Sequence, residues 1–121
     1  MRNGLLLIDK PSGITSHDIV YSVRRWSSQK QVGHAGTLDP LATGLMVVLM
    51  GEATKLSDYV LNGDKAYVVE LKLGVKTDSG DSDGKIIEEK AVSVTESQIQ
   101  ACVQKLEGSF VWPVPIYSAV K

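Results

Sequence analysis

The stretch from Gly33 to Gly44 constrains the folding of this chain more than any other, and it reads Gly-His-Ala-Gly-Thr-Leu-Asp-Pro-Leu-Ala-Thr-Gly. It contains three glycines, one proline and a single carboxylate, that of Asp39. Glycine adopts backbone angles that other residues avoid, and Pro40 restricts the residue before it to extended or turn conformations. The pattern predicts a shaped surface loop that holds the Asp39 carboxylate in one direction. From these residues alone, Asp39 is either a turn residue or a catalytic group.

The composition is typical of one globular domain with a core. Of the 121 residues, 43% are hydrophobic and 22% are charged. The longest apolar run, residues 45–50, is far shorter than a membrane span. Charged residues interrupt the N-terminal apolar stretch too early for a signal peptide. The single cysteine, Cys102, excludes an internal disulfide, so we expect a buried structural thiol in a protein of the reducing cytoplasm.

The charges are unevenly distributed, although the formal net charge is only −1. Residues 1–36 carry five Lys or Arg against two acidic residues. Because this basic part of the chain includes the start of the glycine-rich stretch, the pattern predicts that an anionic partner approaches there. Arg24 and Arg25 are expected to be exposed.

The first half of the chain predicts alternating strands and helices. Residues 5–8 predict a buried strand, and a helix follows from Thr15 or Ser16. Residues 45–50 predict a central strand that is buried on both faces and closed by Gly51. A short helix is expected over residues 54–61. The buried stripe of the first helix is predicted to contain Ile19, Val20, Val23 and Trp26.

The second half predicts further strands and one more helix. Alternating apolar residues indicate a strand over residues 66–73, a polar loop over 76–84 and a strand from Ile86. Thr95 and Gln98 form a capping-box pattern that opens a helix through Leu106. Residues 113–121 are expected to be extended. The order of elements predicts an α+β fold with a mixed, largely antiparallel sheet flanked by helices.

Most kinds of chemical site are disfavoured by spacing. No close pair of ligands has a zinc-type spacing, and residues 79–90 imitate a calcium loop but lack the required first and last ligands. Neither a nucleotide-binding glycine loop nor a hydrolase elbow is present. The glycine-rich stretch, its basic flank and Tyr67 suit a flat, uncharged ring carried on a phosphate chain.

The residues closely resemble those of the TruB family of tRNA pseudouridine synthases. Residues 33–44 are similar to the signature loop of that family, and residues 4–18 are similar to its N-terminal motif. Further motifs follow in family order, so the resemblance covers essentially the whole chain. They are Gly51-Glu52-Ala53-Thr54-Lys55, Asp64-Lys65-Ala66-Tyr67, Leu73-Gly74, Thr77-Asp78, Asp81-x-Asp83-Gly84 and Tyr117-Ser118-Ala119.

The resemblance implies the pseudouridine synthase fold and the isomerisation of uridine at position 55, in the TΨC arm of tRNA, without a cofactor or metal. By resemblance, Asp39 is the catalytic nucleophile, and the target base flips out of its stack to reach it. Tyr67 is expected to stack on the flipped base, and His34 to contact the RNA where that nucleotide was displaced. Lys10 and Lys55 are expected to support the loop or the RNA backbone.

Family members are longer than this sequence. The resemblance implies that residues 1–121 are the N-terminal part of the catalytic domain, without its second half and without a C-terminal PUA-type domain. The second half carries an arginine that pairs with the catalytic aspartate and that Asp81 is expected to help hold. We therefore expect these residues to be inactive alone. A non-catalytic tRNA-binding or folding module remains the alternative, followed by a phosphate- or calcium-binding scaffold, and no membrane partner is expected.

Overall fold

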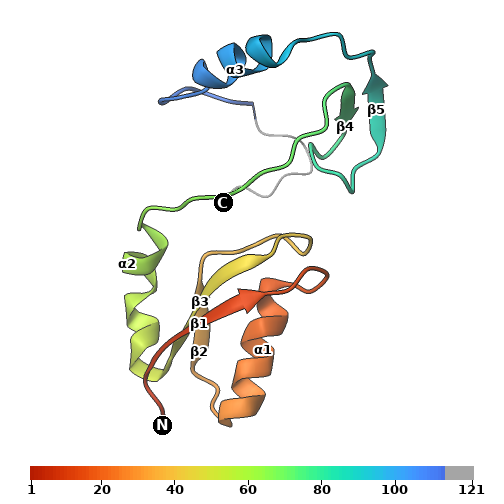
Figure 1. Ribbon diagram of the computed structural model, residues 1–121. Helices are drawn as coiled ribbons and strands as arrows, with labels where there is room; N and C mark the ends of the chain where they lie inside the picture. The colour runs from red at the N-terminus through yellow and green to blue at the C-terminus, as the bar shows by residue number, and fades with distance from the viewer. Residues whose placement is uncertain (114–121) are drawn as a thin grey trace. The chain divides into compact units, whose positions relative to one another are not determined.

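The computed structural model describes residues 1–113, and the chain divides into two compact units at Ala66 and Tyr67 (Figure 1). The motif at residues 117–119 and the expected extended residues after Pro113 lie outside the described part. The first unit contains three strands, two α-helices and a 3₁₀ helix, and the described part of the second contains a two-stranded sheet and one helix. The predicted α+β class is confirmed, and both described sheets are antiparallel.

The first unit is built on a three-stranded sheet with β3 in its centre. The sheet order is β1-β3-β2, and both pairings are antiparallel. Lys10 lies opposite Gly44 at one end of the sheet, and Gly4 and Val32 both lie opposite Met50 at the other end. The strands are β1 (Gly4–Lys10), β2 (Val32–Ala35) and β3 (Gly44–Met50).

Helix α1 (Ser16–Ser27) covers one face of this sheet (Figure 1). It begins as predicted, because the Thr15 side chain accepts from the Asp18 amide while the Asp18 carboxylate accepts from the Thr15 amide. Its apolar stripe packs against alternate residues of the strands, which is the arrangement that buries one face of each element. The buried core consists of Ile19, Val20, Val23, Val32, Met46, Val48 and Met50.

Burial of the sheet is less complete than the sequence predicted. Along β1 exposed and half-buried residues alternate, so Leu5 and Leu7 lie on an exposed face. Leu45 is exposed as well, and β3 is buried on successive residues only at Val48, Leu49 and Met50. The prediction of a strand buried on both faces is therefore correct for the second half of β3 only.

Two residues of α1 also differ from the prediction. Trp26 was placed in the buried stripe, yet 65% of its surface is exposed because it lies at the edge of the helix face that meets the sheet. Arg24 was expected to be exposed but is half-buried, since its guanidinium donates to the Val32 carbonyl at 2.8 Å. This bond ties the helix to the first residue of β2.

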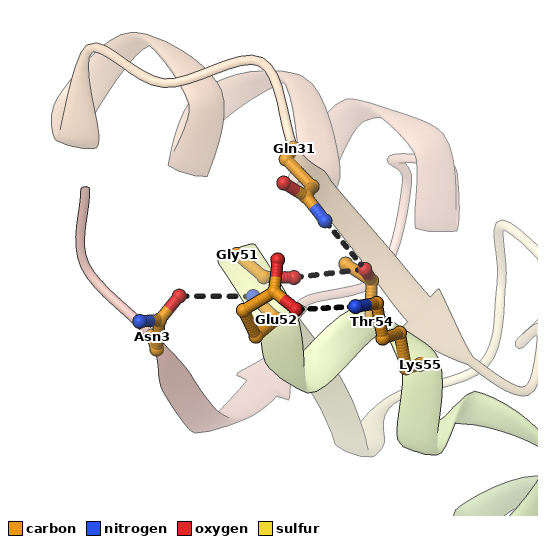
Figure 2. Close-up of polar contacts among 6 residues, drawn as sticks. All are labelled: Asn3, Gln31, Gly51, Glu52, Thr54 and Lys55. Carbon is orange, nitrogen blue, oxygen red and sulfur yellow. Dashed lines mark hydrogen bonds and ion pairs between the residues drawn. The ribbon is translucent and has the colours of Figure 1, made fainter.

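At the far end of β3 the chain turns into the 3₁₀ helix η1 (Gly51–Leu56) and then α2 (Ser57–Leu61), where one helix was expected from residue 54. Figure 2 shows how side chains secure this corner. The Asn3 side chain accepts from the Glu52 amide at 2.9 Å, and Gln31 donates to the Thr54 hydroxyl at 3.2 Å. Gly51 has a φ of +59°, and a Cβ there would lie 2.0 Å from the Asn3 side-chain oxygen, which explains the glycine.

The second unit contains β4 (Val75–Thr77), β5 (Ile86–Glu89) and α3 (Glu96–Gln104). The capping box of Thr95 is confirmed, although α3 ends before Leu106 and the chain continues in tighter i−3 turns. The predicted strand over residues 66–73 is absent. A strand needs a neighbour to share main-chain hydrogen bonds, and no strand among residues 1–113 pairs with this segment. Cys102 is exposed, so the prediction of a buried thiol was wrong.

Within residues 1–113, no helix has both the length and the apolar character needed to cross a membrane.

Lys10 is the largest polar side chain of the core and has 0% of its surface exposed. Its ammonium group donates to the carbonyls of Pro11 at 2.8 Å, Ile14 at 2.7 Å and Pro40 at 3.0 Å. An ammonium carries three donors, so all of them are satisfied. Lys10 thus joins the end of β1 to the turn after it and to the loop before β3.

We expect Lys10→Met to lower the free energy of unfolding by at least ~3 kcal/mol, because three carbonyls lose a charged donor. Urea denaturation of the full-length protein measures this difference. Lys55→Met is the matched control: Lys55 is exposed and pairs with Glu52 on the surface, so its replacement is expected to leave the urea midpoint almost unchanged. Equal losses from the two substitutions would contradict a central role of Lys10.

Candidate functional site

The Asp39 loop consists of residues 36–43 and connects β2 to β3 (Figure 1). The sequence predicted one shaped loop over residues 33–44, but its ends belong to strands, since Gly33–Ala35 pair with residues of β3 and Gly44 pairs with Lys10. The first residue of the loop, Gly36, has a φ of +97°, and this conformation lets the chain turn sharply at the end of β2. The loop is therefore shorter and its two ends are fixed by the sheet.

The turn between β1 and α1 holds one side of the Asp39 loop. The Gly13 amide donates to the Pro40 carbonyl at 2.8 Å, and this carbonyl also accepts from Lys10. The Ser12 hydroxyl donates to the Leu41 carbonyl at 3.0 Å. These bonds join segments about thirty residues apart in sequence, and they fix the chain directly after Asp39.

The first residue of α1 holds the other side. Ser16 is buried, its hydroxyl donates to the Leu38 carbonyl at 3.0 Å, and the same oxygen accepts from the Leu38 amide at 2.9 Å. The Leu38 side chain packs against the core. The Asp39 carbonyl in turn accepts from the Ala42 amide at 3.0 Å. Both neighbours of Asp39 are thus anchored through their main chains.

Asp39 itself is exposed on this anchored loop. A carboxylate held on a rigid loop at the surface can meet a large substrate and can act as a nucleophile or stabilise positive charge. Because the residues on both sides are fixed, the carboxylate needs little further ordering before it reacts.

His34 lies in β2, two residues before the Asp39 loop begins, and is half-buried. Its Nδ1 lies 2.8 Å from the Gly36 carbonyl oxygen. A carbonyl only accepts, so Nδ1 carries the hydrogen in this bond, and in the neutral ring Nε2 is then an acceptor. The structure therefore places His34 near the end of β2 and Asp39 on the loop that follows this strand.

Two other residues singled out in the sequence, Tyr67 and Lys55, are not part of the β2–β3 connection. Tyr67 is exposed and is the first residue of the second unit, so its approach to Asp39 stays a prediction. Lys55 lies on η1, at the Met50 end of the sheet, and forms an ion pair with Glu52. Asp39 follows the opposite end of the sheet, so Lys55 makes no described contact with the loop, and its expected support of the RNA backbone stays a prediction.

The calcium-like sequence of the second unit forms a turn in which the Asp81 carboxylate is hydrogen-bonded by residues of the same turn. The Asp81 carboxylate accepts from the Ser79 hydroxyl at 2.6 Å and from the amides of Asp83 and Gly84, both at 3.0 Å. These bonds, led by that from Ser79, lower the pKa of Asp81. Among residues 1–113, no group of three or more candidate ligands gathers around a metal position.

Sequence reasoning missed the anchors of the Asp39 loop. Ser12 and Ser16 carry no special spacing, and Lys10 received only a general supporting role. The only sequence feature that marks these residues is their place in a short polar segment between a strand and a helix cap. Their hydrogen-bond partners lie more than twenty residues away, so the sequence does not indicate which loop they bind.

The chain matches the family described as "TruB family pseudouridylate synthase (N terminal domain)" over residues 24–121. It is 50% identical to a tRNA pseudouridine synthase B of Bdellovibrio bacteriovorus, with 98% of this chain and 39% of that protein aligned. It is also 50% identical to the protein of the same name from Lactobacillus delbrueckii subsp. bulgaricus, over 100% of this chain and 41% of that protein.

A third relative is the tRNA pseudouridine synthase B of Caldicellulosiruptor saccharolyticus, which is 47% identical over 98% of this chain. The chain spans about two fifths of the length of these relatives. The similarity includes both the Asp39 loop and the residues of the second unit, because the family match extends from within α1 to the last residue. The chain belongs to the TruB family of pseudouridylate synthases.

Proposed function

We propose that the protein carrying this chain converts uridine to pseudouridine at position 55, in the TΨC arm of tRNA, and that Asp39 is its nucleophile. The observation that carries this proposal is the Asp39 loop, in which main-chain anchors on Leu38 and Pro40 hold a surface carboxylate in place. Membership of the TruB family and the names of the relatives supply the reaction and the tRNA substrate. Such a substrate and the lone cysteine suit the cytoplasm.

The reaction is an isomerisation, so every atom of the uridine is kept. The bond from C1′ of the ribose to N1 of uracil breaks, the base turns, and a bond from C1′ to C5 forms. C5 loses its proton and N1 takes one up, so the composition of the nucleotide is unchanged. The base is neither oxidised nor reduced overall, so the chemistry calls for no redox cofactor. The Asp39 carboxylate assists by attacking either the uracil ring or the sugar and leaves again at the end.

The exposure of Asp39 fits a substrate whose base leaves its stack. A uridine within a folded RNA arm reaches a protein carboxylate only after it is extruded, which costs a few kcal/mol of stacking and pairing energy. We propose that His34 contacts the RNA where the nucleotide was displaced, with Nε2 as its remaining ring acceptor. Tyr67 is proposed to stack on the flipped base.

The second unit supports the proposal that these residues are one part of a larger catalytic domain. None of its described residues is buried, and the apolar side chains of α3 are exposed. The exposed apolar residues include Ile99, Val103 and Leu106, together with Val69 and Leu71 of the segment predicted as a strand. Large exposed apolar patches mark surfaces that other chain segments cover.

Asp39→Asn in the full-length protein tests the nucleophile, because asparagine keeps the size and removes the reactive carboxylate. We expect pseudouridine formation to fall by at least ~10³-fold, with the Kd for unmodified tRNA within about threefold of the wild type. Asp58→Asn is the control, since this acid is exposed on α2, and it is expected to keep activity. Retained activity in Asp39→Asn would overturn the assignment, and tRNA binding without any pseudouridine in the wild type would favour a non-catalytic binding module.

Ser16→Ala tests whether anchoring of the loop matters for the reaction. Loss of both bonds to Leu38 is expected to lower stability by ~1–2 kcal/mol and kcat by about tenfold, with KM almost unchanged, because Asp39 is less well oriented. Ser22→Ala makes the same chemical change on the exposed side of α1 and is expected to leave kcat unaltered. Steady-state kinetics over a range of tRNA concentrations give kcat and KM, and equal values for both variants would contradict a positioning role for Ser16.

Residues 1–121 expressed alone are expected to form no pseudouridine in unmodified tRNA, because the proposed site needs further residues of the domain. Detection of pseudouridine by mass spectrometry of the digested tRNA checks this expectation. Turnover by the isolated chain at a rate comparable to that of the full-length protein would show that the site is complete without them.

A further inference from the structure

The basic residues of the first 36 positions do not gather around the Asp39 loop, where the sequence placed the anionic partner. Lys10 is buried and satisfied by carbonyls. The other four lie on the N-terminal arm, in the last turn of α1 and directly after it: Arg2, Arg24, Arg25 and Lys30. Since α1 starts at the loop and has 12 residues, its last turn lies about 15 Å along the helix axis from its start.

Two of these arginines are held against exposed aromatic rings of α1. The Arg2 guanidinium lies 5.3 Å from the centre of the Trp26 ring, and that of Arg25 lies 6.0 Å from the centre of the Tyr21 ring. Tyr21 and Trp26 have 56% and 65% of their surfaces exposed. We call Arg2, Tyr21, Arg25 and Trp26 the α1 patch. Cation–π contacts of this kind restrain a guanidinium without neutralising its charge.

The position of Arg2 is fixed by the end of the helix. Its amide donates to the Gln29 side-chain oxygen at 3.0 Å, and the Gln29 side-chain nitrogen donates back to the Arg2 carbonyl at 3.0 Å. A terminal arm that would otherwise be mobile is thereby docked next to Trp26. The arrangement presents a guanidinium at a defined place on the surface and does not leave it on a free tail.

Two acidic side chains of the first unit, those of Asp18 and Glu52, have partners outside the α1 patch. The Asp18 carboxylate accepts from both the amide and the hydroxyl of Thr15, which lowers its pKa. Glu52, whose amide contacts the Asn3 side chain, carries its carboxylate in an ion pair with Lys55. Within residues 1–113 neither Arg2 nor Arg25 forms an ion pair with an acidic side chain, so the α1 patch is a cationic, aromatic surface whose charge is complementary to a polyanion.

We propose that the α1 patch binds the sugar–phosphate backbone of the tRNA whose target base reaches Asp39. This inference rests on the proposed function, because it takes tRNA as the substrate. A nucleic-acid duplex carries about one phosphate per 1.7 Å of axis, so a stretch of about 15 Å presents roughly nine phosphates. Arginine pairs with phosphate in a bidentate manner, and exposed aromatic rings stack on sugars and bases at the edge of such contacts.

The test reverses both charges in the full-length protein, Arg2→Glu with Arg25→Glu, and measures the Kd for unmodified tRNA over a range of salt concentrations. We expect at least a tenfold weaker Kd and a salt slope smaller by about two, one for each lost phosphate contact. Lys72→Glu with Lys105→Glu is the matched control, because it changes the net charge equally at exposed positions of the second unit, and it is expected to keep the slope. Arg2→Lys with Arg25→Lys keeps the charges and is expected to keep most of the slope.

Wild-type affinity and slope in the double reversal would overturn the α1 patch as a tRNA contact and leave an acidic protein as the partner class that its charge suits. Equal weakening by the control pair would overturn it too, since net charge would then explain the effect. If the wild type itself fails to bind tRNA, the proposed function fails. If it binds and the double reversal changes nothing, only this inference fails. Circular dichroism of each variant confirms that α1 is intact.

Discussion

The buried ammonium of Lys10 is the interaction on which the arrangement of the first unit depends. A charged group with no exposed surface is costly unless its donors are satisfied, and here three carbonyls satisfy all of them. Those carbonyls belong to the turn after β1 and to the loop before β3, so the charge can be buried only when both segments are in place. The side chain that fills the end of the core therefore also sets the conformation of the Asp39 loop.

Features encoded locally were predictable from the sequence, and those that depend on distant partners were not. The capping box at Thr95 uses residues three positions apart and was correctly predicted, and the start of α1 at Thr15 or Ser16 was predicted as well. The central place of β3 followed from its apolar run. The prediction of a strand over residues 66–73 was wrong. Alternating apolar residues show that a segment could form a strand, but a strand forms only where a neighbouring strand pairs with it. The prediction that Cys102 is buried was wrong for a similar reason, because no other described segment covers a face of α3.

The same distinction applies to the candidate site. The glycines, Asp39 and Pro40 predicted a shaped loop, and the structure keeps that loop while shortening it to residues 36–43. The anchors could not be predicted, because Ser12, Gly13 and Ser16 bind carbonyls or an amide more than twenty residues away. Family resemblance supplied only the proposed role of Asp39. The hydrogen bonds of its neighbours give the physical reason why the loop around this carboxylate is fixed.

Helix α1 connects the Asp39 loop to the α1 patch. Its first residue, Ser16, binds the Leu38 main chain and so borders the Asp39 loop, while its last turn carries Arg25 and Trp26 and receives the N-terminal arm through Gln29. A helix is stiff over this length, and its stripe of Ile19, Val20 and Val23 is fixed on the sheet. The separation between the carboxylate and the cationic surface is therefore set by the fold. A large polyanion that contacts both would be oriented by this spacing before any base reaches Asp39, which is how binding energy far from a reacting group contributes to its positioning.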